Sequence, residues 1–269
     1  MINHSRLILL LFGILLISTL PSPAQSISTP GSVDSSFYIY LVMGQSNMAG
    51  RGKIEGKYTR MKHPRVFMLD QEQEWVKAHH PVHFDKPKIA GVGPALSFGI
   101  EMAKAHKKNK IGLVPCAVGG TSIQHWKPGA YDNRTDTHPW DDAVVRIRKA
   151  MQEGVVKGVI WHQGESDSAP EKAAHYLEDL DDLIQRVREL TVNPELPFVA
   201  GQLGRYKDQY KNINKVLEKL PKKVNHTAVA SSEGLTPKED GVHFDSRSAG
   251  LMGRRMAEKM EELEDLNDN

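Results

Sequence analysis

Short apolar runs alternate with longer amphipathic segments along most of this chain. Six runs have the length of β-strands, at residues 37–43, 66–69, 111–114, 155–161, 198–202 and 227–231. The runs around Val114, Ile160 and Val199 are continuously apolar, which is typical of strands buried on both faces. A periodicity near 3.6 residues predicts helices at 94–107, 141–153, 169–190, 209–220 and 246–263. This alternation predicts an α/β fold with a central parallel sheet covered by helices on both faces.

Two stretches interrupt the regular pattern. Residues 51–93 carry Gly, Pro and His, and residues 126–139 are rich in Pro, Asp and aromatic side chains. We expect both to be inserted loops near the functional site. No repeat or second linker divides residues 37–269, and we expect them to form a single domain.

The N-terminus has the composition of a signal peptide. Arg6 precedes an apolar core at 7–20, and small residues at 22 and 24 predict cleavage after Ala24. A membrane anchor is the competing interpretation, but an apolar run of about 14 residues is short for a bilayer span. We therefore predict a signal peptide at 1–24, a polar tether at 25–36, and a secreted or periplasmic protein without stable membrane association after cleavage.

Composition and charge narrow the possible partners. The chain has 269 residues, 39% of them apolar and 25% charged, with a net charge of +2. This length allows one sizeable core, and the weak net charge argues against nucleic acid as a partner. Cys116 is the only cysteine, so no intramolecular disulfide can form. It ends an apolar run, and we interpret it as a buried small hydrophobe rather than a catalytic thiol.

Four polar segments each follow a predicted strand. Ser46 follows the first strand, residues 119–122 the third, residues 162–167 the fourth, and Asp240 and His243 the last. Ligands bind at the carboxyl ends of the strands in open parallel sheets. We therefore expect the four segments to converge on one rim of the sheet.

These segments contain the three groups that turn a hydroxyl into a nucleophile. Ser46 lies between Gly44 and Gly50, which allow a sharp turn and a close approach of substrate; the alternative is a helix N-cap serine. His243 can take the Ser46 proton while Asp240 orients its ring; the alternative is a loop in which Asp240 only forms a turn. Together the three residues indicate acyl transfer, above all ester hydrolysis.

Gly119, Gly120 and Gln163 are candidates for stabilising an oxyanion. Glycine N–H groups can approach a developing negative charge because no Cβ blocks them, although the pair is equally consistent with a plain turn. Gln163 ends a predicted buried strand, where its amide either donates to the same oxyanion or is a structural group bonded within the core.

The remaining candidates have weaker support. His162 is either a core residue or a partner of a catalytic group, and Trp126, Trp140 and Tyr131 either stack on sugar rings or pack. Glu165 and Asp167 keep a glycosidase as a rival, since paired carboxylates cleave glycosides. Three histidines, His79, His80 and His83, share a loop, but no acid is spaced to complete a metal site. We therefore expect no metal and no cofactor.

Taken together and in order, the four segments resemble the sequence blocks of the SGNH-hydrolase superfamily. Within it they resemble the carbohydrate esterase family 6 or sialate O-acetylesterase-like group, which is related to acetylxylan esterases. The matching blocks are 44–50 (GQSNMAG), 114–122 (VPCAVGGTS) with Trp126, 161–167 (WHQGESD) and 240–244 (DGVHF). The resemblance extends over residues 37–262, nearly the whole chain after the predicted tether.

The resemblance implies a three-layer α/β/α sandwich like flavodoxin. It also implies that Ser46 is the nucleophile, His243 the general base and Asp240 its orienting acid. The oxyanion hole would comprise the N–H groups of Ser46 and of Gly119 or Gly120, with the side chain of Gln163. The wider superfamily carries Asn where this chain has Gln163. Further side chains expected to bind substrate or to support the site are Gln45, Asn47, Trp126, His162 and Glu165.

The predicted function is that of a secreted serine carbohydrate acetylesterase. It would remove O-acetyl groups from plant polysaccharide such as xylan through an acetyl-enzyme. A sialate O-acetylesterase is the alternative substrate assignment, and a non-catalytic carbohydrate-binding protein is the alternative of another class. The sequence leaves open the sugar, the acetylated position, the oligomeric state and the compartment outside the cytoplasm.

Overall fold

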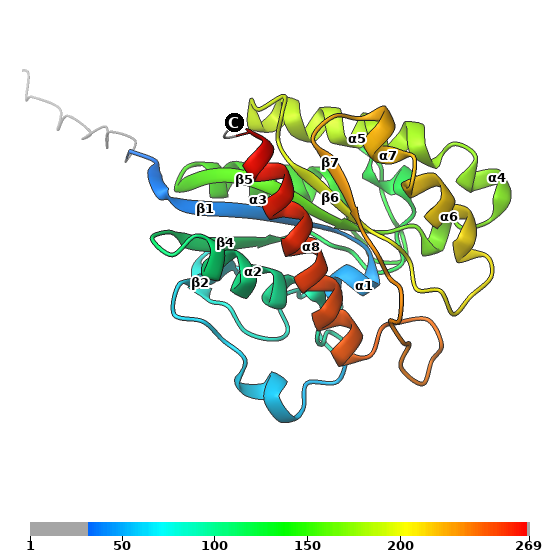
Figure 1. Ribbon diagram of the computed structural model, residues 1–269, viewed down its shortest axis with the longest axis horizontal. Helices are drawn as coiled ribbons and strands as arrows, with labels where there is room; N and C mark the ends of the chain where they lie inside the picture. The colour runs from blue at the N-terminus through cyan, green and yellow to red at the C-terminus, as the bar shows by residue number, and fades with distance from the viewer. Residues whose placement is uncertain (1–31, 268–269) are drawn as a thin grey trace, which may run out of the picture. The chain divides into compact units, whose positions relative to one another are not determined.

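The computed structural model describes residues 32–267, which are built around a seven-stranded sheet (Figure 1). Its strands are β1 (Asp34–Gly44), β2 (Val66–Leu69), β3 (Trp75–Lys77), β4 (Lys110–Pro115), β5 (Gly154–His162), β6 (Phe198–Gly201) and β7 (Thr227–Ala230). All six predicted strands are confirmed to within a few residues. Strand β3 was not predicted, because three residues are too few to show a periodicity.

Strand order confirms the predicted flavodoxin-like arrangement and adds a hairpin to it. The order across the sheet is β3-β2-β4-β1-β5-β6-β7, and all pairings are parallel except that of β2 with β3. Without β2 and β3, the remaining five strands have the chain order 2-1-3-4-5 that is characteristic of flavodoxin. The β2–β3 hairpin arises from the irregular stretch at 51–93 and extends the sheet beside β4, so that stretch is not loop alone.

The predicted N-terminal segments lie largely outside the described residues. This holds for the whole predicted signal peptide at 1–24 and for most of the predicted tether at 25–36. The last three residues of that tether, 34–36, belong to β1, so the ordered fold begins earlier than predicted. None of the helices within residues 32–267 is long and apolar enough to cross a membrane.

Eight α-helices and three short 3-10 helices accompany the sheet in the described part of the chain. The α-helices are α1 (Ser46–Ala49), α2 (Pro94–Ala105), α3 (Pro139–Met151), α4 (Pro170–Ala173), α5 (Tyr176–Thr191), α6 (Tyr210–Leu217), α7 (Leu220–Lys223) and α8 (Ser246–Asn267). The 3-10 helices are η1 (Gly56–Arg60), η2 (Ile123–Trp126) and η3 (Glu165–Asp167).

Two predicted helices are each divided in the structure. The predicted helix at 169–190 is split into α4 and α5, and that at 209–220 is split where α6 ends at Leu217. Pro221 is the second residue of α7. A proline ring clashes with the carbonyl four residues earlier, which here belongs to Leu217, so α6 cannot continue through Pro221.

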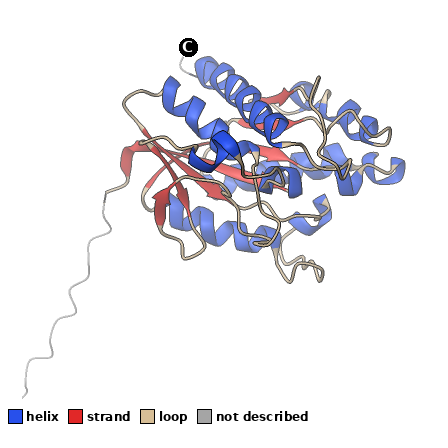
Figure 2. Cartoon of the chain, turned by 90° about the horizontal axis from the view of Figure 1, so that it is seen from below, coloured by secondary structure: helices blue, strands red, loops and turns tan. Residues whose placement is uncertain are grey.

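Helices cover both faces of the sheet (Figure 2), as the prediction of three layers requires. Successive side chains of a strand point to opposite faces. Ile39, Leu41 and Met43 of β1 therefore join one core with α3, α5 and α6, whereas Tyr40 and Val42 join a second core with α2 and α8. Both cores consist of buried apolar side chains, and full burial of a large one contributes about 1.5–3 kcal/mol.

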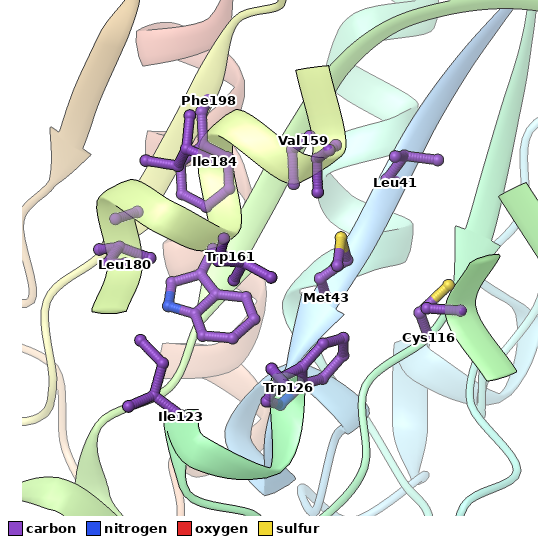
Figure 3. Packing of buried hydrophobic residues seen from close by; sticks show 14 of the residues in the cluster. Leu41, Met43, Cys116, Ile123, Trp126, Val159, Trp161, Leu180, Ile184 and Phe198 are labelled. Atoms are coloured by element: carbon purple, nitrogen blue, oxygen red, sulfur yellow. The ribbon is translucent and has the colours of Figure 1, made fainter. Parts of the chain in front are cut away.

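Cys116 lies in the first of these cores (Figure 3). Its side chain is buried, and burial raises the pKa of its thiol to about 12. A thiol with this pKa carries almost no thiolate at neutral pH, and the thiolate is the reactive form. The interpretation of Cys116 as a small buried hydrophobe is confirmed.

The close packing of α8 on α2 generates a first prediction. A Cβ at Gly253 of α8 would lie 2.1 Å from the Pro94 carbonyl oxygen, whereas the atom nearest to one at Gly250 would be the Ser97 hydroxyl oxygen at 3.2 Å. Gly→Ala in a helix ordinarily stabilises by about 1 kcal/mol. We expect Gly253→Ala instead to destabilise the fold by about 1–3 kcal/mol, because backbone must move. Gly250→Ala is the matched control in the same helix.

Denaturant unfolding of both variants measures the difference. The expected result is a lower midpoint for Gly253→Ala and a midpoint near or above wild type for Gly250→Ala. Equal stabilisation by both substitutions would show that α8 does not pack against the backbone of α2 at Gly253.

Candidate active site

Strand β1 ends at Gly44, and this glycine allows the chain to place Ser46 at the rim of the sheet. Gly44 has a φ of +134°, and a Cβ there would lie 2.2 Å from the His162 carbonyl oxygen. The same oxygen accepts the Gln45 N–H at 2.9 Å. The chain then turns into α1, whose N-cap residue is Gln45, so Ser46 is not the helix cap that the sequence allowed as an alternative.

Ser46, His243 and Asp240 form a continuous chain of hydrogen bonds. His243 Nε2 lies 3.0 Å from Ser46 Oγ, and His243 Nδ1 lies 2.8 Å from Asp240 Oδ2. The other Asp240 oxygen accepts the N–H groups of Val242 and His243, each at 2.9 Å. These bonds fix the acid and the imidazole in one tight turn. The structure therefore brings together the three residues that the sequence singled out from opposite ends of the chain.

The environment of Asp240 favours its ionised form. Partial burial raises the pKa of this carboxyl, but the hydrogen bonds from His243, from the Val242 N–H and from Lys238 outweigh it and hold the pKa well below its usual range. Lys238 Nζ lies 3.2 Å from Asp240 Oδ2. An ionised Asp240 accepts a hydrogen bond from the Nδ1–H of His243 and so leaves Nε2 without a hydrogen and able to face the serine.

The side-chain amide of Gln163 is bonded within the protein, which contradicts its predicted role in the oxyanion hole. Its side chain is fully buried, and Nε2 lies 2.6 Å from Asp167 Oδ2 and 3.1 Å from both Thr121 O and Gln45 Oε1. The Tyr176 hydroxyl donates to Gln163 Oε1 at 2.8 Å. An amide has only two N–H hydrogens, so both are taken by protein acceptors. The alternative of a bonded structural amide is the correct one.

The side-chain oxygen of Gln45 accepts hydrogen bonds from Gln163 and from the backbone that follows it. Its Oε1 lies 3.1 Å from Gln163 Nε2, 3.5 Å from the Gly164 N–H nitrogen and 3.4 Å from that of Ser166. Its Nε2 has no hydrogen-bond acceptor among residues 32–267. Next to Ser46, the side-chain amide that still has hydrogens to donate is therefore that of Gln45.

Gly119 and Gly120 differ in what their N–H groups bind. The Gly119 N–H donates to Asp85 Oδ2 at 2.9 Å, and the Gly119 carbonyl accepts from Lys86 Nζ at 3.0 Å. A Cβ on Gly119 would lie 3.4 Å from Ser46 Cβ, so this residue borders the nucleophile. Within the described chain, the N–H groups of Gly120 and Ser46 have no acceptor. The geometry thus favours Gly120 over Gly119 as the oxyanion donor that the sequence left undecided.

A buried ion pair supports this glycine. Arg51 Nη2 lies 2.6 Å from Asp85 Oδ2, and both side chains are only 3% exposed. Arg51 Nη1 also donates to the Gly50 carbonyl at 2.7 Å. The pair joins the nucleophile segment to Gly119 and neutralises a carboxylate that would otherwise oppose a nearby oxyanion. The sequence placed this stretch near the site but did not single out Arg51, Asp85 or Lys86, because no local pattern reveals a pairing across 34 residues.

Asn47, Glu165 and His162 also contact protein groups. Asn47 Oδ1 accepts the Phe244 N–H at 2.9 Å, and Asn47 Nδ2 donates to Glu165 Oε1 at 2.6 Å. His162 is fully buried, and its Nε2 lies 3.1 Å from the Gln202 carbonyl oxygen. Burial lowers the pKa of His162, so its ring is neutral at pH 7. These three side chains support the site rather than offering a surface to substrate.

The glycosidase alternative requires two carboxylates at the site, and Asp167 cannot be the second one. Asp167 is 2% exposed, and its Oδ2 accepts from Gln163 and from the Ile123 N–H at 2.9 Å. Burial raises the pKa of Asp167, although these bonds partly offset the rise. A carboxylate bound inside the core cannot flank a glycosidic bond with Glu165.

Trp126 and Trp140 are packing residues, the second of the two alternatives that the sequence left open. Trp126 has no exposed surface, and Trp140 is 7% exposed. The Trp126 ring meets that of Trp161 edge to face at 5.2 Å, in the core drawn in Figure 3. Tyr131 is the exposed aromatic side chain of this loop, at 49%.

The histidine loop shows no metal site in the described residues. No three His, Cys, Asp or Glu side chains within 32–267 are grouped so that they could hold a metal ion. His80 and His83 are buried, and burial lowers the pKa of each to about 4. Both are therefore neutral core residues at pH 7.

The chain is similar to known carbohydrate esterases. A model of the family described as carbohydrate esterase, sialic acid-specific acetylesterase, matches residues 36–262. The chain is 30% identical over 243 residues to the probable carbohydrate esterase At4g34215 of Arabidopsis thaliana, covering 82% of this chain and 88% of that protein. The X-ray structure of the Arabidopsis protein matches with a TM-score of 0.74 at 28% identity, covering 84% and 98% of the two chains.

A bacterial structure shares the fold. XAC1771, described as a carbohydrate acetylesterase from Xanthomonas citri, matches with a TM-score of 0.66 at 20% identity. The match covers 84% of this chain and 56% of that protein. At this identity the likeness is evidence for the fold alone.

The Arg51–Asp85 pair generates a second prediction. Removing one partner of a buried ion pair leaves an uncompensated charge, so we expect Arg51→Met to destabilise the fold by about 3–5 kcal/mol. Adding Asp85→Asn should recover much of that loss. The matched control is Lys53→Met, because the Lys53–Glu239 pair is 65% and 89% exposed and should contribute less than about 1 kcal/mol.

Urea unfolding of the three variants measures these differences. A loss for Arg51→Met no larger than that for Lys53→Met would show that the buried pair is not formed in solution.

Proposed function

Because this chain belongs to the sialic acid-specific acetylesterase family of carbohydrate esterases, we propose that it hydrolyses O-acetyl esters of carbohydrates through an acetylated Ser46. The observation that carries the proposal is the pair of bonds from Asp240 to His243, 2.8 Å, and from His243 to Ser46, 3.0 Å. A base within this reach can take the serine proton as the hydroxyl attacks.

The proposed reaction has two halves. Ser46 Oγ attacks the acetyl carbonyl carbon while His243 Nε2 takes its proton, and the carbonyl oxygen becomes an oxyanion. The N–H groups of Ser46 and Gly120, with the Gln45 amide, are the donors available to bind this oxyanion. His243 then gives the proton to the departing sugar oxygen as the ester C–O bond breaks. Water attacks the acetyl-serine in the same way and releases acetate.

Plant polysaccharide such as acetylated xylan is the first candidate substrate. The exposed side chain of Tyr131 offers an aromatic face outside the core for a sugar ring. A polysaccharide also fits the export that the N-terminal sequence predicts, because such substrates lie outside the cell.

O-acetylated sialic acid is the second candidate, and two cations favour it. Lys86 Nζ contacts the Gly119 carbonyl and Arg134 Nη2 contacts the Gly120 carbonyl. Both cations thus contact the loop that borders Ser46. The Arg134 side chain is 61% exposed and also pairs with Asp132 at 3.1 Å. Sialic acid carries a carboxylate that a cation can bind, whereas xylose is neutral.

A third prediction tests the serine mechanism and the substrate together. Protein from Gln25 onward should release acetate from 4-nitrophenyl acetate and from an acetylated sugar, and Ser46→Ala should lose at least about 10³-fold in kcat. Acetylated xylan and O-acetylated sialic acid are compared under the same conditions. The matched control is Ser36→Ala, which removes an exposed hydroxyl bonded to Asp34.

The outcomes separate the alternatives. Faster release from xylan supports the first candidate, and faster release from sialic acid supports the second. Acetate release by Ser46→Ala at the wild-type rate would exclude Ser46 as nucleophile. A wild-type protein that binds acetylated sugar without hydrolysing any ester would be a carbohydrate-binding protein.

A fourth prediction concerns pH. The depressed pKa of Asp240 means that its charge is present at neutral pH and is lost only as the pH falls through that low value. Asp240 should therefore stay charged between about pH 8 and 5 and take up no proton there. We expect the acid-side limiting slope of log kcat/KM for 4-nitrophenyl acetate not to exceed about one in this range, the slope that a single protonation produces.

The pH profile of Asp240→Asn provides the comparison. This variant should lose about 10²–10⁴-fold in kcat at pH 7.5, by analogy with other Ser-His-Asp enzymes. A limiting slope near two for the wild type would show that Asp240 loses its charge within this range.

A further inference from the structure

We propose that Glu165 is a positioning residue for the catalytic histidine and acts through the side-chain amide of Asn47. The inference rests on the proposed function, because it concerns how the Ser46–His243 pair of that reaction is held. Glu165 touches neither of these two side chains. Its effect would pass through hydrogen bonds to the loop that carries His243.

Asn47 forms hydrogen bonds to the loop that carries His243, one on each side of that residue. Its Oδ1 accepts the Phe244 N–H at 2.9 Å, and its Nδ2 lies 3.4 Å from the Val242 carbonyl oxygen. These two peptide groups flank His243. Since Asn47 directly follows Ser46 in α1, one side chain ties the nucleophile segment to the segment of its base, 197 residues away.

Glu165 favours the orientation of the Asn47 amide in which both of these hydrogen bonds can form. An amide side chain can turn over and exchange its oxygen and nitrogen, and only one arrangement places Oδ1 toward the Phe244 N–H. Glu165 Oε1 lies 2.6 Å from Asn47 Nδ2. A carboxylate only accepts hydrogen bonds, so it favours the Asn47 nitrogen and holds the oxygen toward Phe244. Because the acceptor is charged, this bond is stronger than one between neutral groups.

Stability alone does not explain a carboxylate in this place. The Glu165 side chain is 6% exposed, and its Oε2 has no hydrogen-bond partner in the described chain. The described chain places no cation beside this carboxylate either. His162 Nδ1 lies 3.8 Å from Glu165 Oε1, but it belongs to a ring whose pKa is lowered by burial. A buried carboxylate with an unpaired oxygen costs stability, and such exceptions call for a functional reason.

The test exploits the direction of the Asn47–Glu165 bond. Asn47→Asp replaces the donor with a carboxylate and places it against that of Glu165, so the two repel. Adding Glu165→Gln supplies a new donor at residue 165 and restores one hydrogen bond with its direction reversed. The Phe244 N–H keeps an acceptor in both cases. We expect Asn47→Asp to lose roughly 10²-fold in kcat for 4-nitrophenyl acetate, and the double variant to recover at least about tenfold.

Glu165→Ala tests the carboxylate by itself. Losing one charge-assisted bond should lower kcat roughly 10–100-fold, with KM changed by less than about twofold, because no substrate contact is lost. Glu165→Gln keeps an oxygen that can accept and should lose less than Glu165→Ala. Glu171→Gln is the matched control, since Glu171 is exposed on α4 and its change should leave kcat at the wild-type value. Thermal unfolding verifies that every variant is folded at the assay temperature.

Crystal structures of the wild type, Glu165→Ala and the double variant give a readout that does not need turnover. We expect the Ser46 Oγ to His243 Nε2 distance to exceed hydrogen-bonding range in Glu165→Ala and to return in the double variant. Wild-type kcat in Glu165→Ala, or no recovery in the double variant, would overturn the proposal. If the wild type hydrolyses no acetyl ester, the proposed function fails, while the measured distances still decide whether Glu165 positions His243.

Discussion

The parallel pairing of β1 with β5 is the contact on which the site depends. Its register places Gly44 opposite His162, and the two backbones approach so closely that a Cβ on Gly44 would lie 2.2 Å from the His162 oxygen. That oxygen then accepts the Gln45 N–H. The nucleophile segment and the segment after β5 therefore leave the sheet as one hydrogen-bonded unit. The positions of Ser46 and Gln163 follow from this approach, which a side chain on Gly44 would prevent.

The parts of the site that the sequence predicted are those encoded by local pattern. Ser46 follows an apolar strand and lies between glycines, and Asp240 and His243 are close enough along the chain for a single turn to bring them together. The sheet was equally predictable, because continuous apolar runs indicate strands buried on both faces. The carboxyl ends of parallel strands meet at one rim, so convergence of the polar segments followed from topology. Each of these inferences needed only neighbouring residues and one general rule.

The parts that the sequence did not predict depend on partners distant along the chain. The direction of the Gln163 amide is decided by Thr121, Asp167 and Gln45, which compete with any substrate for its two hydrogens. The pairing of Arg51 with Asp85 has no sequence signature either, because it joins two irregular loops. The sequence left open whether Trp126 stacks on a sugar or packs, and only its contact with the Trp161 ring decides for packing. The type of a side chain limits which hydrogen bonds it can form, but the groups around it decide which of them do form.

In the proposed mechanism, the loop that carries His243 contributes both to stability and to catalysis. It is closed as a hairpin by the Lys238 N–H, which donates to the His243 carbonyl at 2.8 Å. Phe244 anchors it: this fully buried ring meets His162 edge to face at 5.4 Å and Tyr206 at 6.1 Å. Because the anchor lies directly after the base, burying one aromatic side chain also removes the freedom of the imidazole. The entropy of placing a base beside Ser46 is thus lost during folding, so that it need not be lost when substrate binds.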